Sequence, residues 1–345
     1  MTLIAAYRSY GIPVLMGDLL ITGGGMSDDY RRKICRFSPH FVVAWTGHLI
    51  LAEIIFTEIR RKMVNHSLTK EWLESVLTSY QVEDFGLLSI RLVGWIIDQG
   101  ENCFRWNSEY PSELFYGEPM LDGTGAPFID GFVGQGNIYD MEYPEAIDLE
   151  KAKEHCLFLA TNLMSEEILK PGSTQSYGFG YAYEMLCLTE SGFQYIDELM
   201  YFVLTVKFDC NWKFESASIE NPMYTYSQQN EYAIIHKLNR EGESDLSIIA
   251  FPGSSTDLSE GNDLVKKYAN AFVNKNIAIP NVYCIFLNYI GVNYRGPLFS
   301  MLVNSDDMEA SPIKIVRGSQ GKMQVILHQG TLEEFYRDIR SDQEL

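Results

Sequence analysis

Four residues in the first fifty have the types and the order that hydrolytic chemistry needs. Thr2 follows the initiator methionine, Asp18 ends an apolar run, and Lys33 and Gly47 follow along the chain. A threonine that becomes the first residue carries both a hydroxyl nucleophile and an α-amine that can act as its base. The ordered set predicts a hydrolase that uses its own N-terminal residue.

The other three residues fit roles around that nucleophile. A threonine hydroxyl is a weak nucleophile until a base takes its proton, and an α-amine has a pKa of about 7.7–8.0. A nearby ammonium lowers this pKa, and Lys33 would supply that charge. Asp18 would hold Lys33 charged and in place. The backbone N–H of Gly47, at a strand end, would donate to the oxyanion of the tetrahedral intermediate.

Hydrophobic patterning and turn residues predict the elements that would position this set. The apolar runs near the N-terminus indicate strands that are covered on both faces. Up to residue 205 we expect strands at 2–8, 12–18, 33–37 and 41–46, helices at 49–63 and after Thr69, strands at 87–98 and 102–106, helices after residue 125 and at 149–164, and a hairpin at 181–196. This order favours a sheet sandwich with helices outside it.

The rest of the chain predicts a second unit of α+β or α/β class. The polar stretch Ser216–Glu231, rich in Ser, Asn and Gln, is the best candidate for the boundary. The elements expected beyond it include strands at 246–251, 282–289, 313–317 and 323–328 and helices at 262–274 and 332–340. No role for this unit follows from its sequence.

Composition excludes several classes of function. The net charge of −19 argues against a nucleic-acid partner and against an anionic membrane. No apolar segment is long enough to span a bilayer, and no signal peptide is visible. The 6 cysteines and 6 histidines are scattered without metal-ligand spacing, which favours reduced thiols in a cytoplasmic protein without a metal site.

The N-terminal part of the chain resembles the proteasome β-subunits and their bacterial relative, the HslV-type peptidase. The resemblance rests on Thr2, its spacing to Asp18, the Lys33-Ile34 strand start, and the Trp45-Thr46-Gly47 strand end before a helix. It implies an α+β chain with a four-layer αββα N-terminal-nucleophile sandwich over residues 1–205 and a C-terminal extension over 206–345. It also implies a peptide or protein substrate, no cofactor, and a homo-oligomer such as a ring, and it leaves an ATPase unfoldase open.

The resemblance also implies that further residues, matched by position to that family, belong to the site. The backbone of Thr22 would pair with an extended substrate. The wall of the specificity pocket would include Ile21, Arg31, Cys35, Trp45, Leu49 and Glu53. Thr124 keeps a hydroxyl at one supporting position. The family's supporting acid and serine fall near Ser176 and Phe179, so the acid is missing.

Each residue also has a simpler interpretation. Asp18 could be a turn residue, Lys33 could belong to a solvated basic edge with Arg31 and Arg32, and Trp45 could pack in the core. For the whole domain, the alternatives to a threonine peptidase are a catalytically inactive proteasome-like scaffold and a small-molecule amidase on the same fold. The peptidase requires Met1 to be removed, and we expect a mature chain that begins at Thr2.

Overall fold

The computed structural model describes most of the N-terminal two thirds of the chain and separate strands beyond it. The described residues are 2–21, 29–64, 66–133, 147–169, 173–180, 182–197, 199–211, 213–229, 232–238, 244–249, 281–290, 294–295, 299–304, 313–317, 323–327, 330 and 337.

The chain divides into two compact units. The first is Met1–Ile196 with the short segments Gln228–Ala233 and Ile249–Thr256, and the second contains the remaining residues from Asp197 onward. The boundary predicted after residue 205 falls inside strand β13 (Leu199–Phe208). Because β13 pairs along its length with β14 and β17, the second unit begins before this strand.

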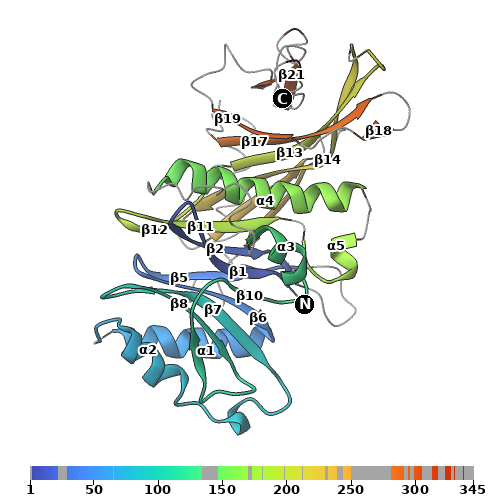
Figure 1. Ribbon diagram of the computed structural model, residues 1–345. Coiled ribbons are helices and arrows are strands. Elements are labelled where there is room, and N and C mark those ends of the chain that lie inside the picture. The colour runs from blue at the N-terminus through green and yellow to red at the C-terminus, as the bar shows by residue number, and fades with distance from the viewer. Residues whose placement is uncertain are drawn as a thin grey trace. The chain divides into compact units, whose positions relative to one another are not determined.

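Two five-stranded antiparallel sheets make up the first unit (Figure 1). One has the order β10-β1-β2-β11-β12, with β1 (Ile4–Ser9), β2 (Ile12–Asp18), β10 (Met120–Asp122), β11 (Tyr183–Thr189) and β12 (Gly192–Tyr195). The other has the order β5-β6-β7-β8-β9, with β5 (Ile34–Ser38), β6 (Phe41–Gly47), β7 (Ile90–Ile97), β8 (Glu101–Asn107) and β9 (Leu114–Tyr116). A separate short pair joins β3 (Leu20–Ile21) to β4 (Asp29–Tyr30).

Apolar side chains of both sheets meet in one core cluster. Ile4 and Leu15 come from the first sheet, and Val42, Val93 and Trp95 come from the second. Every residue of β2 is buried, which confirms the prediction of a strand covered on both faces. The burial of this apolar surface is the main term that holds the sheets together.

Helices cover the outer faces of these sheets (Figure 1). Helix α1 (Leu49–Met63) buries Leu51, Ile55 and Ile59 in the cluster that also contains Trp72 of α2 (Lys70–Leu77). The hydroxyl of Thr69 accepts the N–H of Trp72 at 3.2 Å, so Thr69 is the N-cap of the helix predicted after it. Helix α4 (Leu149–Leu169) lies over β1, β2 and β11, beside α3 (Ala126–Val133); a 3₁₀ turn η1 (Val82–Asp84) and the short α5 (Ser173–Ser176) complete this α+β unit.

The second unit is built around a mixed sheet of seven strands. Its order is β16-β15-β14-β13-β17-β18, with β19 also paired to β17, and β13 runs parallel to β17. The strands are β14 (Phe214–Gln229), β15 (Tyr232–Leu238), β16 (Ser244–Ile249), β17 (Asn281–Ile290), β18 (Tyr294–Arg295) and β19 (Phe299–Asn304), with a separate hairpin of β20 (Ile313–Arg317) and β21 (Met323–Leu327).

Most of the predicted boundary at Ser216–Glu231 is strand β14, and the chain first passes from one unit to the other at Asp197. Polar residues do not prevent a strand whose backbone groups are paired, and the run Tyr224-Thr225-Tyr226 has high strand propensity. These three residues pair with Leu199, Met200 and Tyr201 of β13. The helices predicted at 262–274 and 332–340 lie outside the described residues, apart from Arg337.

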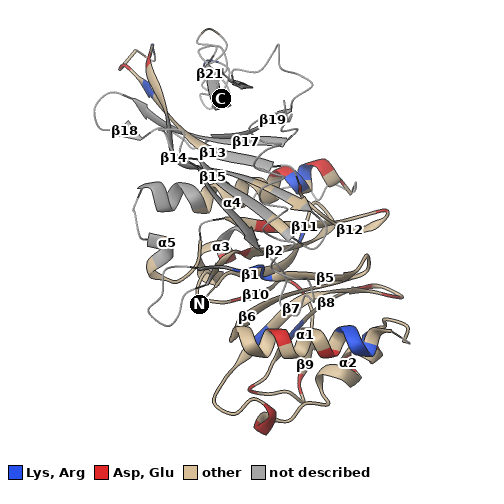
Figure 2. Ribbon diagram, turned by 180° about the vertical axis from the view of Figure 1, so that it is seen from behind, with Lys and Arg blue, Asp and Glu red and all other residues tan. Residues whose placement is uncertain are grey.

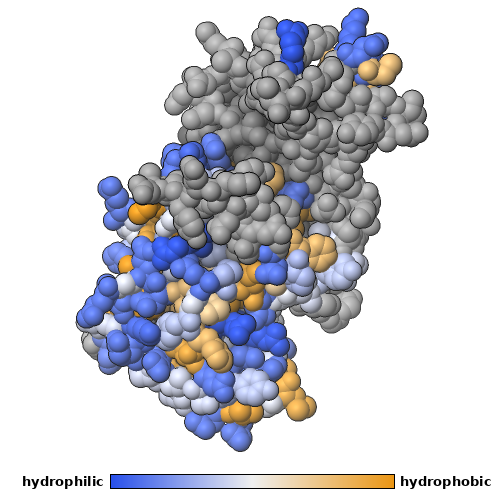
Figure 3. All heavy atoms as spheres, viewed as in Figure 1, coloured by the Kyte–Doolittle hydropathy of each residue, from blue (hydrophilic) through white to orange (hydrophobic). Residues whose placement is uncertain are grey.

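The described surface carries mixed charge. Figure 2 shows acidic and basic residues together on α1, where Glu58 pairs with Arg61 at 2.6 Å and with Lys62 at 3.5 Å. In Figure 3, small hydrophobic areas are interspersed with hydrophilic ones over the described face. Within the described ranges, no helix has the length and apolar character needed to cross a membrane.

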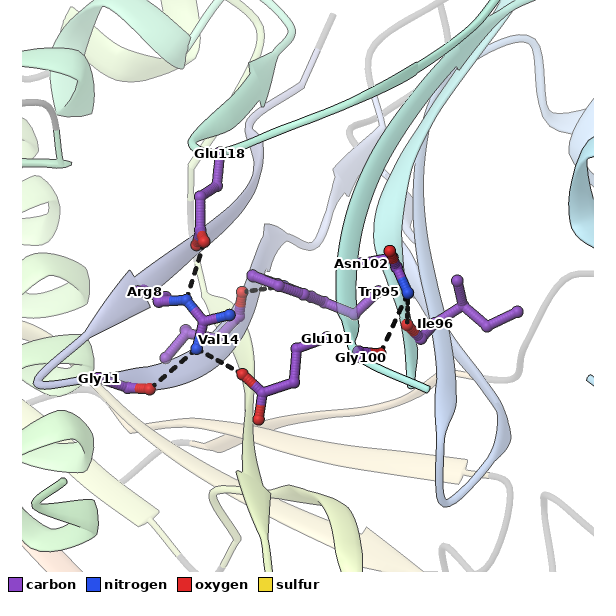
Figure 4. A network of polar contacts seen from close by, with 9 residues as sticks. All are labelled: Arg8, Gly11, Val14, Trp95, Ile96, Gly100, Glu101, Asn102 and Glu118. Carbon is purple, nitrogen blue, oxygen red and sulfur yellow. Dashed lines mark hydrogen bonds and ion pairs between the residues drawn. The ribbon is translucent and has the colours of Figure 1, made fainter. Parts of the chain in front are cut away.

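Arg8, near the C-terminal end of β1, links the first sheet to the second (Figure 4). The guanidinium of Arg8 donates to Glu118 at 2.8 Å and to Glu101 of β8 at 2.5 Å, and also to the carbonyl of Gly11 at 3.1 Å. It lies over the ring of Trp95 at 5.4 Å from the centroid. Both carboxylates raise the pKa of Arg8 against the effect of its partial burial.

We expect Arg8→Met to lower the free energy of unfolding by about 1 kcal/mol, a value discounted for the solvent exposure of the pair. Urea denaturation measures this change. Arg61→Met is the matched control, because Arg61 pairs with Glu58 on an exposed helix face, and it should leave the unfolding midpoint unchanged. Equal midpoints for wild type and Arg8→Met would show that the contacts of Arg8 do not stabilise the fold.

Candidate active site

Thr2 and Asp18 are in direct contact at one end of the first sheet. The Thr2 hydroxyl donates to Asp18 Oδ1, and the backbone N–H of Leu3 donates to the same oxygen at 2.8 Å. Thr2 and Asp18 have relative exposures of 1% and 0%, respectively. The hairpin places them together, because Ile4 pairs with Gly17 and the N–H of Asp18 donates to the carbonyl of Leu3 at 3.0 Å.

Lys33, which directly precedes β5 of the second sheet, packs against the strand that ends at Asp18. A Cβ added to Gly17 would lie 3.1 Å from Cβ of Lys33, so the lysine packs directly against β2 beside Asp18. Lys33 is 3% exposed and Arg32 is fully buried in a pair with Glu184. The alternative of a solvated basic edge is therefore wrong for these two residues.

The electrostatics of Asp18 and Lys33 are dominated by burial. Burial raises the pKa of Asp18, whereas the charge of Lys33 and the hydrogen bonds from Leu3, Thr2 and Gly180 lower it. Burial lowers the pKa of Lys33, Asp18 acts in the opposite direction, and the charge of Arg31 lowers it further. Each group therefore depends on the other to stay charged.

Gly47 is the last residue of β6 in the second sheet, and Lys33 directly precedes β5 of the same sheet. The register pairs Ile34 with Ala44, and the N–H of Trp45 donates to the carbonyl of Lys33 at 2.9 Å. Gly47 itself is exposed and has a φ of 113°. A Cβ at this position would overlap the carbonyl oxygen of Ser89, so no other residue fits without a shift of the backbone.

A glycine turn covers the backbone of Thr2. The N–H of Gly125 donates to the carbonyl of Thr2 at 3.1 Å, and a Cβ added to Gly123 would overlap that same oxygen. The half-buried Thr124 between them donates its hydroxyl to the carbonyl of Tyr177. Thr124 thus lies in the turn that holds Thr2, although its own hydroxyl binds elsewhere.

The segment around Phe179 differs from what the sequence predicts. Ser176 is exposed at the end of α5, whereas Asp18 is fully buried. Phe179 is fully buried and packs on Phe128 at 5.0 Å between ring centroids. The supporting contact comes instead from the backbone, because the N–H of Gly180 donates to Asp18 Oδ2 at 3.2 Å. The sequence carries no signal for this contact, because a backbone N–H makes it.

The residues predicted to wall a specificity pocket do not gather on one open surface. Trp45 and Cys35 are buried, Leu49 and Arg31 are half-buried, and Glu53 is exposed. Glu53 lines a groove of about 540 Å³ on α1, together with Ile54, Thr57, Glu58, Lys62 and Tyr80. Thr22 and the side chain of Ile21 lie outside the described residues. The described members of this set therefore do not form one open wall.

Neither a metal site nor a match to known proteins gives further information about this site. Among the described side chains, no three of the His, Cys, Asp and Glu type come together as a metal site would require. No family model matches the chain, and a search of curated proteins finds no match either.

Proposed function

We propose that this chain is an N-terminal threonine hydrolase, and specifically a peptidase, on a four-layer αββα N-terminal-nucleophile sandwich. The main supporting observation is the hydrogen bond from the Thr2 hydroxyl to Asp18 at the end of β2. Lys33 packs against the same strand. Three residues that are distant in the sequence thereby lie close together, which supports the proposal. The layered arrangement of sheets and helices supports the fold assignment.

In the proposed reaction, Thr2 is the first residue of the mature chain. Asp18 fixes the orientation of the threonine hydroxyl, and the new α-amine on the same residue takes its proton as the oxygen attacks a carbonyl carbon. The charge of Lys33 keeps the amine unprotonated at working pH. The Gly47 N–H donates to the oxyanion, and the amine returns the proton to the leaving nitrogen as the C–N bond breaks. Water, with the same amine as base, then hydrolyses the ester on Thr2.

A catalytically inactive scaffold is the strongest alternative. Thr2 is 1% exposed, and a buried aromatic ring stands where the resemblance places a second supporting hydroxyl. A small-molecule amidase is the third possibility. An oligomeric ring, a peptide substrate and a cytoplasmic location stay predictions.

The proposal is tested by measuring the first residue and the activity of the same preparation. Intact mass should show a chain that starts at Thr2, and this chain should cleave members of a fluorogenic peptide library. A matched control inserts Glu between Met1 and Thr2, which blocks methionine removal and leaves no free amine on Thr2. This control should fold and be inactive.

The outcomes separate the three functions. A chain that starts at Thr2 and cleaves neither peptides nor small amides is the scaffold. Cleavage of small amides alone identifies the amidase. Equal peptide cleavage by the control with the inserted Glu would overturn the proposal, because an N-terminal amine would then be unnecessary.

A further inference from the structure

Trp45 makes a direct contact with the ammonium group of Lys33. The Nζ atom of Lys33 lies over the indole ring, 4.7 Å from its centroid. At this distance the negative face of the ring attracts a cation, and the attraction is strongest where water is excluded. Both residues are almost completely buried, with relative exposures of 1% and 3%.

The indole ring is fixed in this position from two sides. Its Nε1–H donates to the carbonyl of Arg32 at 2.9 Å, and its backbone N–H donates to the carbonyl of Lys33 at 2.9 Å. Trp45 therefore binds the segment that carries Lys33 through its backbone, its ring edge and its ring face. Any buried tryptophan needs partners for these two N–H groups, so the contact particular to Trp45 is that of its ring face with the Lys33 ammonium.

Lys33 needs such a contact because few of the described charged groups support it. The charged groups that act on its pKa are Asp18, which favours the ammonium, and Arg31, which opposes it. The supporting acid that the resemblance places near Ser176 is absent from the sequence. Asp18 is also shared, because it accepts hydrogen bonds from Thr2, Leu3 and Gly180.

We propose that Trp45 is a positioning residue, whose ring face holds the Lys33 ammonium at the candidate site. Its effect on hydrolysis rests on the function proposed above, whereas the contact itself does not. The role also explains why a large aromatic residue that offers little surface to a substrate stands at a predicted pocket position.

The contact is tested first without any activity measurement. The fluorescence of Trp45 is isolated as the difference between wild type and Trp45→Phe, and is followed from about pH 7 to about pH 11. Loss of the proton from Lys33 should change this emission with a midpoint below 10.5, the ordinary pKa of lysine. The same difference measured in a Lys33→Met background should be flat. A flat wild-type curve, or a curve that Lys33→Met leaves unchanged, would overturn the contact.

The role in hydrolysis is tested with Trp45→Leu. Removal of the ring should move the alkaline limb of the pH–rate profile down by about one pH unit, because Lys33 then loses its proton more easily. Trp45→Phe keeps a ring face and should shift less. Trp106→Leu is the control, since Trp106 lies in the same core cluster and donates its Nε1–H to Pro111 at 3.0 Å. Equal shifts for Trp45→Leu and Trp106→Leu would reduce Trp45 to core packing.

The two proposals can fail separately. A fluorescence titration that depends on Lys33, in a protein without hydrolase activity, would keep the contact and remove the enzyme. Hydrolysis with an unchanged alkaline limb in Trp45→Leu would keep the enzyme and overturn the positioning role.

Discussion

Replacement of Thr2 by alanine is expected to lower the rate of hydrolysis by at least about 10³-fold, because the covalent route loses its nucleophile entirely. Thr2→Ser keeps both hydroxyl and amine and should retain measurable activity, since only the methyl group that restricts the rotamer is lost. Initial rates on a fluorogenic peptide, with the first residue of each variant confirmed by mass, measure both effects.

A second buried threonine supplies the control for this experiment. Thr161 of α4 is fully buried and donates its hydroxyl to the carbonyl of Leu157 at 2.6 Å. Thr161→Ala removes a buried hydroxyl elsewhere in the same unit and should leave the rate near that of wild type. Activity in Thr2→Ala would place the reaction at another site.

Lys33→Met is the second change with a large expected effect. Methionine fills a similar volume without the charge, so the rate should fall by about 10²-fold or more. Stability should fall as well, by about 3 kcal/mol, because Asp18 is left buried without the positive charge that acts on it. Activity of the wild type should also be lost as the pH rises through the lowered pKa of Lys33, below 10.5.

The double variant Asp18→Asn/Lys33→Met separates the two effects. Both charges are gone, so the free energy of unfolding should return toward that of wild type, whereas hydrolysis should stay lost. Chemical denaturation and peptide assays of wild type, Lys33→Met and the double variant provide the comparison. A wild-type rate in Lys33→Met would remove this lysine from the site.

The order of elements in the first unit could be predicted from the sequence because its signals are local. Alternating and continuous apolar runs, the Thr69 cap and the spacing of Leu51, Ile55 and Ile59 each specify a helix or strand directly. The short strands β9 and β10 were missed, since three residues carry no periodicity. The strand β14 was missed because its polar residues outweighed its strand propensity.

The candidate site could be predicted only in part, because several of its features depend on how distant segments of the chain pack. The types and spacing of Thr2, Asp18 and Lys33 are visible in the sequence, but their nearly complete burial depends on how two sheets pack. The contact from Gly180 to Asp18 is made by a backbone N–H, which has no side-chain signature. The position of the Lys33 ammonium over the ring of Trp45 likewise depends on the pairing of β5 with β6.

The central claim is that one residue supplies both the nucleophile and the base. An epoxyketone tests this most directly, because it must react with a hydroxyl and an adjacent amine to form a cyclic product. Intact and peptide mass spectrometry of the treated protein should show one adduct, on Thr2, and none in Thr2→Ala or in the control with Glu inserted before Thr2. A chain confirmed to begin at Thr2 that forms no adduct, or an adduct on another residue, would contradict the account.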